Sequence, residues 1–166
     1  MFNVGDLIIY GNSGVCRVES IGPSQLEGAD SSKDYYCLAP YYSSNSRIYT
    51  PCDNEKIVMR AIISRDEAEC LIDDIASIGL MTIEDEKNRE NIYKSVIRRC
   101  DARELVSILK TIHERKQVRL SEGKKVTAND EKYFNLAEDK LHGELAVALG
   151  IAKDRIKEYI RVRLEA

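Results

Sequence analysis

The spacing of apolar residues changes once along the chain, and this change predicts a strand-rich part followed by a helix-rich part. Up to residue 63, short apolar runs alternate with Gly, Pro, Asn and Ser, which is typical of strands joined by turns. The expected strands are 6–10, 15–21, 34–40 and 47–50. From Ser64 onward the apolar period is 3.6 residues, which predicts amphipathic helices. We therefore expect an α+β protein with domains at 1–63 and 64–166.

A hairpin is the first expected element. The apolar run at 7–10 is followed by Gly11-Asn12-Ser13-Gly14 and then by a second β-rich run. Because Asn and Gly tolerate positive φ, Asn12-Ser13-Gly14 is expected to form a plain turn, with a ligand-binding loop as the alternative. Four or five short antiparallel strands fit a small, strongly curved barrel, whose edges and grooves suit protein docking.

About five helices are expected after the strands. Residues that commonly cap helices mark three of the starts, at Ser64, Asp101 and Thr127. Gly79 and Gly150 mark the ends of the first and fourth helices, and the second is expected over about 85–99. A basic loop at 120–126 joins the third helix to the fourth. Together these helices predict a compact bundle.

Composition argues against several classes of protein. No run of eighteen apolar residues occurs, and the N-terminus lacks a basic-then-apolar signal segment, so we expect a cytoplasmic protein without a membrane partner. The five cysteines are widely spaced and form no C-x-x-C pair, which favours reduced thiols. With two histidines and no glycine-rich phosphate loop, neither catalysis nor a cofactor or metal is expected.

The net charge of −3 conceals a segregation of charge along the chain. Residues 64–86 contain one basic residue against eight acidic ones, whereas residues 87–125 contain twelve basic residues against five acidic ones. Because local potential governs association with a polyanion, the second segment is a candidate nucleic-acid surface despite the acidic total.

Within the basic segment, the second helix carries a stripe of cations. At 100° per residue, Lys87, Asn91, Lys94 and Arg98 fall within about 60° of one another, opposite the apolar face. Further cations around the loop extend this set. Cations a turn or two apart fit contacts to phosphates without reading bases. The alternative is a solvated face whose arginines complement the helix dipole.

The opening pattern of the chain, Phe2-x-Val4-Gly5-Asp6 with the hairpin that follows, resembles the CarD/CdnL family of bacterial transcription regulators. The same module occurs in transcription-repair coupling factors. The resemblance continues through Tyr49-Thr50-Pro51, Asp53-Asn54, the junction from Arg60 to Ala68, and Gly143-Glu144-Leu145-Ala146. It implies a Tudor-like barrel that docks on the RNA polymerase β subunit and a helical domain that contacts promoter DNA.

The resemblance also implies site residues. Some family members carry arginines at positions that align with Ser24 and Tyr49, so polymerase docking is expected at Ser24, Arg47, Ile48 and Tyr49. The family has a tryptophan near the start of the second helix that wedges into the minor groove, and Glu86 stands at the matching position. A carboxylate cannot stack on a base step, so the wedge is lost. DNA contact is expected at Glu86, Lys87, Lys94, Arg98, Arg115, Lys116, Arg119, Lys124 and Lys125.

The expected protein is a monomeric regulator that docks on polymerase and modulates the stability of the open promoter complex through DNA contacts without sequence specificity. Such a factor acts by binding one promoter–polymerase state more tightly than another. We expect the protein to associate with the bacterial nucleoid because it binds RNA polymerase. The alternative is a polymerase-binding adaptor that has lost DNA engagement, which the missing tryptophan favours.

Overall fold

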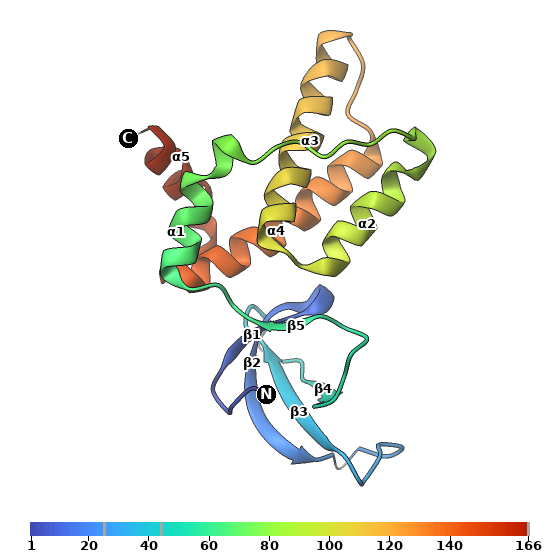
Figure 1. Cartoon of the computed structure of the whole chain (residues 1–166), viewed down its shortest axis with the longest axis vertical. Coiled ribbons are helices and arrows are strands. Elements are labelled where there is room, and N and C mark those ends of the chain that lie inside the picture. Colours follow the sequence, from blue (N-terminus) through green and yellow to red (C-terminus); the bar gives the residue numbers. More distant parts are fainter. Residues whose placement is uncertain (25, 44, 166) are drawn as a thin grey trace. The chain divides into compact units, whose positions relative to one another are not determined.

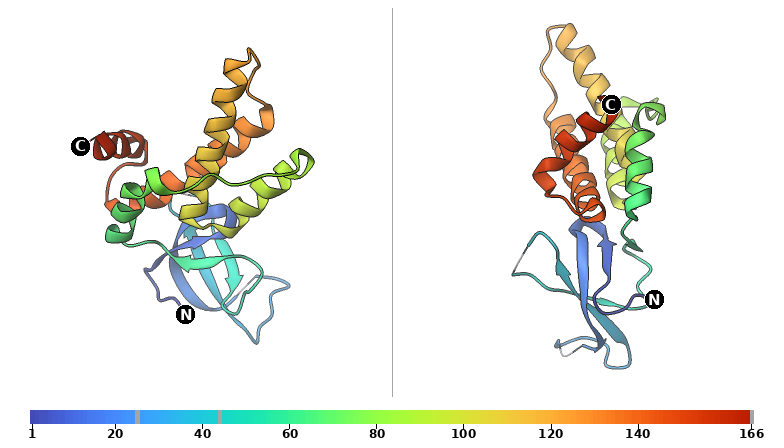
Figure 2. Two further views of the ribbon diagram at one scale, coloured as in Figure 1. Left: turned by 45° about the horizontal axis from the view of Figure 1, so that its top comes forward. Right: turned by 90° about the vertical axis from the view of Figure 1, so that its left-hand side faces the viewer.

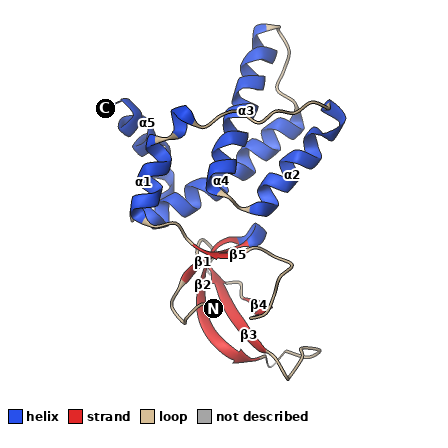
Figure 3. Ribbon diagram, in the orientation of Figure 1, coloured by secondary structure: helices blue, strands red, loops and turns tan. Residues whose placement is uncertain are grey.

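The computed structural model describes residues 1–24, 26–43 and 45–165. Contacts within the chain divide it into two compact units, Met1–Ile62 and Ile63–Ala166, hereafter the sheet unit and the helical unit. Among the described residues, the strands lie in the first unit and the long helices lie in the second, as Figure 1 and Figure 3 show. The predicted α+β class is confirmed.

The sheet unit is built on five antiparallel strands in the order β4-β3-β2-β1-β5. The strands are β1 Leu7–Tyr10, β2 Gly14–Pro23, β3 Asp34–Pro40, β4 Ile48–Pro51 and β5 Met59–Ala61. Across the described residues the sheet is open, with β4 and β5 at its two edges. Closure into a barrel and a Tudor-like character therefore stay predictions.

The β1–β2 hairpin forms as predicted, around a 3₁₀ turn at Gly11–Ser13. Gly14 leaves this turn with a φ of 68°, which glycine adopts without strain. Gly11 is needed for a second reason, since a Cβ at this position would lie 2.6 Å from Cγ2 of Ile57. The turn thus depends on glycine both for its backbone conformation and for space.

Alternation of side chains along the strands builds the core of the sheet unit, which contains Ile8, Tyr10, Cys16, Val18, Tyr36 and Leu38. Val18 pairs with Leu38, but Ser20 pairs with Cys37, so Glu19 is the extra residue of a β-bulge. Burial raises the pKa of the Cys16 thiol to about 11, which fits a small packing residue.

The described residues of the helical unit form five α-helices, drawn from further sides in Figure 2. They are α1 Arg65–Asp73, α2 Arg89–Arg99, α3 Ala102–Ser121, α4 Ala128–Leu149 and α5 Ile156–Glu165. The three predicted caps are confirmed, because the side chains of Ser64, Asp101 and Thr127 each accept a hydrogen bond from the backbone N–H three residues later. None of these helices, within the described part of the chain, is long and apolar enough to cross a membrane.

The first helix is shorter than predicted. It ends at Asp73 and is followed by a 3₁₀ turn at Ile75–Ser77, instead of continuing towards Gly79. Lys110 on α3 supplies the reason, because its ammonium group donates to the carbonyl oxygens of Ile75 at 2.8 Å and Ile78 at 2.5 Å. A cation thus satisfies backbone acceptors that a longer helix would have paired internally.

The second helix also differs at its start. Asp85 Oδ1 accepts a hydrogen bond from the Lys87 backbone N–H at 3.0 Å and so caps a 3₁₀ turn at Glu86–Asn88. The α-helix begins only at Arg89. A phase of 100° per residue therefore does not place Lys87 on the stripe of Lys94 and Arg98, and the sequence prediction was wrong on this point.

The third helix is longer than predicted, because it runs to Ser121 into the expected loop. Arg115, Lys116 and Arg119 consequently lie on its last turns, while Lys124 and Lys125 lie in the connection to α4. Figure 1 shows this end of α3 extending beyond the neighbouring helices of the unit.

A buried carboxylate joins three helices of the bundle. Asp130 in the first turn of α4 is 0% exposed. Its Oδ1 accepts a hydrogen bond from the Tyr93 hydroxyl of α2 at 2.9 Å, and its Oδ2 accepts one from Arg115 Nε of α3 at 2.7 Å. Apolar residues of all five helices pack into one core, to which Tyr93 also belongs.

We expect Tyr93→Phe to lower the free energy of unfolding by about 1–2 kcal/mol, because it leaves the buried Asp130 carboxylate with one donor fewer. Tyr133→Phe is the matched control, since the Tyr133 hydroxyl donates to Glu90 at 3.0 Å near the surface. Urea unfolding of both variants measures the difference. Equal stabilities for the two would contradict the assigned role of Asp130.

Candidate docking groove and basic surface

A groove of about 460 Å³ lies on the side of the sheet that faces away from its core. Its lining residues are Ser20, Ile21, Gly22, Pro23, Ser24, Leu26, Tyr35, Cys37 and Tyr49. Strand alternation explains their position, because Tyr36 and Leu38 turn into the core and leave Tyr35 and Cys37 on the opposite face. We call this the docking groove.

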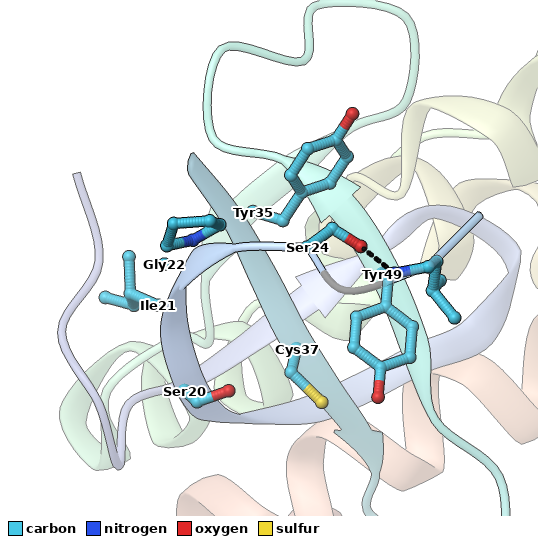
Figure 4. A pocket seen from close by; sticks show the side chains of 9 residues that line it. Ser20, Ile21, Gly22, Ser24, Tyr35, Cys37 and Tyr49 are labelled. Atoms are coloured by element: carbon cyan, nitrogen blue, oxygen red, sulfur yellow. Dashed lines mark hydrogen bonds between the residues drawn. The ribbon is translucent and has the colours of Figure 1, made fainter. Parts of the chain in front are cut away.

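The register of the sheet brings the groove residues together from three strands. Cys37 on β3 lies directly opposite Ser20 on β2 and opposite Tyr49 on β4. Figure 4 shows the side chains of Cys37 and Tyr49 side by side across the two strands. The Ser24 hydroxyl accepts a hydrogen bond from the Leu26 backbone N–H at 3.1 Å, which shapes one end of the groove.

The chemistry of the docking groove suits a protein partner. Its lining is made of tyrosine, leucine, isoleucine, proline, glycine, cysteine and serine, and no charged residue is among those that the structure describes there. Tyr49 is 45% exposed and Leu26 is 52% exposed, so both present apolar area to solvent. Tyrosine is enriched at protein interfaces because it offers a large rigid contact surface with one polar end.

The four residues predicted to contact polymerase do not all line the docking groove. Ser24 and Tyr49 line the docking groove. Ile48 packs against the core of the sheet unit, because it follows the opposite alternation from Tyr49. Arg47 Nε lies 2.7 Å from Glu19 Oε2, outside the set of groove-lining residues.

Sequence reasoning did not single out Tyr35, Cys37 and Leu26 as groove residues. The period of two along β3 contains the signal for Tyr35 and Cys37, since both alternate with the apolar Tyr36 and Leu38. Which of the two faces points to the core is decided by packing. The bulge at Glu19, which shifts the β2 register, has no sequence signal comparable to a glycine or proline.

A second aromatic cluster lies at the other end of β3. The rings of Tyr41 and Tyr42 meet edge to face with their centroids 5.0 Å apart. The Arg17 guanidinium lies 6.0 Å from the centre of the Tyr41 ring. Both tyrosines are nearly half exposed, so they add aromatic surface just beyond the end of this strand.

The predicted cationic stripe on α2 is present in reduced form. Lys94 and Arg98 lie one turn apart and are both exposed. Lys94 Nζ is 3.6 Å from Glu90 Oε1, whereas the side chain of Arg98 has no ion-pair partner among the described residues. The core side of the helix is formed by Tyr93, Val96 and Ile97, as the sequence predicted for the apolar face.

The cations around the end of α3 differ in whether they form ion pairs or hydrogen bonds with other groups of the chain. Lys116 and Lys125 are exposed and make no side-chain ion pair within the described part of the chain, but Lys124 Nζ lies 3.1 Å from Glu122. Arg119 Nε donates to the backbone carbonyl of Lys125 at 2.8 Å and so holds the connection to α4. Arg115 is turned towards Asp130 and Glu86.

Glu86, which the resemblance predicts to stand at the position of the family tryptophan, is not an isolated charge in the structure. Its carboxylate accepts two hydrogen bonds from Arg89, from Nε at 2.8 Å and from Nη2 at 2.7 Å. A third comes from Arg115 Nη1 at 3.0 Å. The hydrogen bonds from Arg89 and the nearby charges lower the pKa of Glu86 to about 2.

The fold and the groove define a class of protein: an α+β chain whose N-terminal antiparallel sheet carries a tyrosine-lined docking groove. Residues 2–63 match the family model of the CarD-like/TRCF RID domain. This match supports a CarD-like RNA polymerase-interacting domain in the sheet unit, and that domain is non-catalytic in its family. A comparison with curated proteins found no match to the chain.

The family match confirms the resemblance of the strand-rich part and ends before α1 begins at Arg65. It does not reach the segment Gly143-Glu144-Leu145-Ala146. The assignment of polymerase docking to the sheet unit and of DNA contact to the helical unit stays a prediction.

The neighbouring thiol should alter the ionisation of Tyr49. The hydrogen bond between the Tyr49 hydroxyl and the Cys37 side chain raises the pKa of Tyr49. The phenol therefore stays protonated to higher pH than usual. We expect Cys37→Ala to lower this pKa and Cys70→Ala, on α1, to leave it unchanged. A pH titration of the Tyr49 ring carbon by NMR measures both. An unchanged pKa in Cys37→Ala would show that the two side chains do not interact in solution.

Proposed function

We propose that this chain is a transcription regulator that docks on the β subunit of bacterial RNA polymerase and modulates the stability of the open promoter complex. The family match of residues 2–63 carries the first half of this proposal, because the domain interacts with RNA polymerase at the family level. The helical unit supports the second half through its exposed cations.

The docking groove and its adjoining strand edge fit an extended segment of a protein partner. β4 is paired with β3 on one side and forms an edge of the described sheet on the other. An extended segment can pair its backbone with such an edge while one of its side chains enters a neighbouring pocket. The exposed ring of Tyr49 lies on this edge strand and lines the groove at the same time.

The exposed cations of the helical unit fit contacts with the DNA backbone. Arg98, Lys116 and Lys125 are exposed cations without an ion-pair partner among the described residues, so a phosphate can reach them without displacing a carboxylate. Contacts of this kind position a protein on DNA but do not read its sequence. The expected binding is accordingly weak, dependent on salt and indifferent to base sequence.

The effect on transcription follows from a difference in binding. A factor that binds the open complex about tenfold more tightly than the closed complex shifts their equilibrium by about 1.4 kcal/mol. No covalent step is required.

A second candidate function is an adaptor that docks on polymerase without engaging DNA. The absence of tryptophan from the chain favours it, as does the pairing of Lys94, Lys124 and Arg115 with carboxylates of the same chain. The adaptor predicts polymerase docking that is independent of the exposed cations of the helical unit.

We expect Tyr49→Asp to weaken binding of the full chain to the polymerase β subunit by more than about tenfold, because it places a charge in an apolar contact that becomes desolvated. Lys33→Asp is the control, since Lys33 lies outside the groove and pairs with Asp53 at 3.4 Å. Biolayer interferometry with immobilised β subunit measures both. Equal losses in the two variants would place the dock elsewhere on the sheet unit.

We expect the double variant Lys94→Glu/Arg98→Glu to abolish most binding to a short DNA duplex. The control is Lys153→Glu/Lys157→Glu, in which the two cations are also four residues apart and one of them is likewise paired, Lys153 with Asp139. Three to five phosphate contacts predict a slope of log K against log salt of about −3 to −5 for the wild type. Fluorescence anisotropy over a salt series gives affinity and slope. Retained affinity in the α2 variant would place the DNA contact away from Lys94 and Arg98, whereas absence of binding by the wild type would favour the adaptor.

A further inference from the structure

The Glu86 carboxylate occupies a site built from two guanidinium groups on two helices. Arg89 presents its Nε and Nη2 to the two oxygens of the carboxylate, and Arg115 adds Nη1 to one of them. The three contacts measure 2.7–3.0 Å, which is typical of charge-assisted hydrogen bonds. An anionic group is therefore bound there already, supplied by the chain itself.

Each of the two arginines also donates a hydrogen bond to a group other than Glu86. The Tyr93 hydroxyl accepts a hydrogen bond from Arg89 Nη1 at 3.0 Å, and the buried Asp130 carboxylate accepts one from Arg115 Nε at 2.7 Å. Their side chains are only 14% and 25% exposed, whereas that of Glu86 is 61% exposed. The arginines are thus preorganised, and the carboxylate in front of them is the part that can move away.

The surroundings of this site are open enough for a larger anion. A pocket of about 410 Å³ is lined by Glu86, Arg89 and Arg115, and also by Lys87, Glu90, Tyr93 and the start of α4 at Thr127, Ala128, Asn129 and Asp130. Glu90 is itself engaged, because it accepts a hydrogen bond from Tyr133 and lies near Lys94. Both partly exposed guanidinium edges face the position that the Glu86 carboxylate now fills.

We propose that Arg89 and Arg115 form a phosphate clamp for the DNA backbone, and that Glu86 fills the clamp whenever DNA is absent. The two non-bridging oxygens of a phosphodiester match the same guanidinium edge that binds a carboxylate in two places. Exchange of one anion for the other leaves neither arginine unpaired. This inference rests on the proposed DNA contact and names a site for it at the position of the family tryptophan.

The clamp gives Glu86 a role beyond simple repulsion of phosphate. Glu84 provides the control that distinguishes the clamp from general repulsion. Glu84 carries the same charge two residues earlier, is exposed and makes no side-chain hydrogen bond or ion pair within the described part of the chain. General repulsion predicts a similar gain in DNA affinity for Glu84→Gln and Glu86→Gln. The clamp predicts a gain for Glu86→Gln alone.

The test compares full-length wild type, Glu86→Gln and Glu84→Gln in two assays. In the first, anisotropy with a short duplex should show an affinity gain of about three- to tenfold for Glu86→Gln and a salt slope steeper by about one. In the second, titration with inorganic phosphate should shift the Nε–Hε signals of Arg89 and Arg115 at lower phosphate concentration in Glu86→Gln than in wild type. Glu84→Gln should match the wild type in both assays.

The outcomes separate failure of the clamp from failure of the proposed function. If Glu86→Gln and Glu84→Gln behave alike in both assays while wild type binds DNA through Lys94 and Arg98, the clamp is overturned and the DNA contact stands. If phosphate binding improves but no variant binds the duplex, DNA is not the ligand. Arg89→Lys in the Glu86→Gln background keeps the charge but removes the two-point edge, so it should return phosphate and duplex affinity to the wild-type level. A persisting gain would also overturn the proposal.

Discussion

The buried carboxylate of Asp130 is the constraint on which the arrangement of the helical unit depends. A charge removed from water must be compensated by hydrogen bonds and an opposite charge. Asp130 obtains them from Tyr93 on α2 and Arg115 on α3, and its own backbone N–H bonds to the Thr127 cap of α4. Because Asp130 holds Arg115 on one side, the remaining edge of that arginine faces Glu86. The same group therefore organises the fold and the anion site at the start of α2.

In the sheet unit, the core and the docking groove are two faces of one pattern. Packing of Tyr36 and Leu38 inward leaves Tyr35 and Cys37 outward, beside Tyr49 of the neighbouring strand. The bulge at Glu19 keeps Ser20 in register with Cys37 and so lets β2 form the third wall. A substitution that shifted the register by one residue would exchange the two faces and remove the groove together with the core.

The proposed function joins two contacts of different strength in one chain. Under this proposal, docking on polymerase would raise the effective concentration of the helical unit near promoter DNA, so that DNA contacts too weak to hold free DNA would still matter in the complex. Glu86 would add a threshold to this second contact, because a phosphate must displace the carboxylate before it reaches Arg89 and Arg115. Such a threshold would reduce association with DNA away from polymerase.

The sequence by itself determined the features that depend on neighbouring residues. The strand runs, the hairpin glycines and the caps at Ser64, Asp101 and Thr127 act over a few residues, so their patterns predicted the α+β class and most element boundaries. Tertiary structure alone decided the contacts between distant residues. Arg115 meets Glu86 across 29 positions and Tyr93 meets Asp130 across 37, and no local pattern indicates such pairs. Lys110 of α3 likewise binds the backbone carbonyl oxygens of Ile75 and Ile78 just after the end of α1. Local propensity sets which elements form, whereas the pairing of buried charges is settled only when packing brings their helices together.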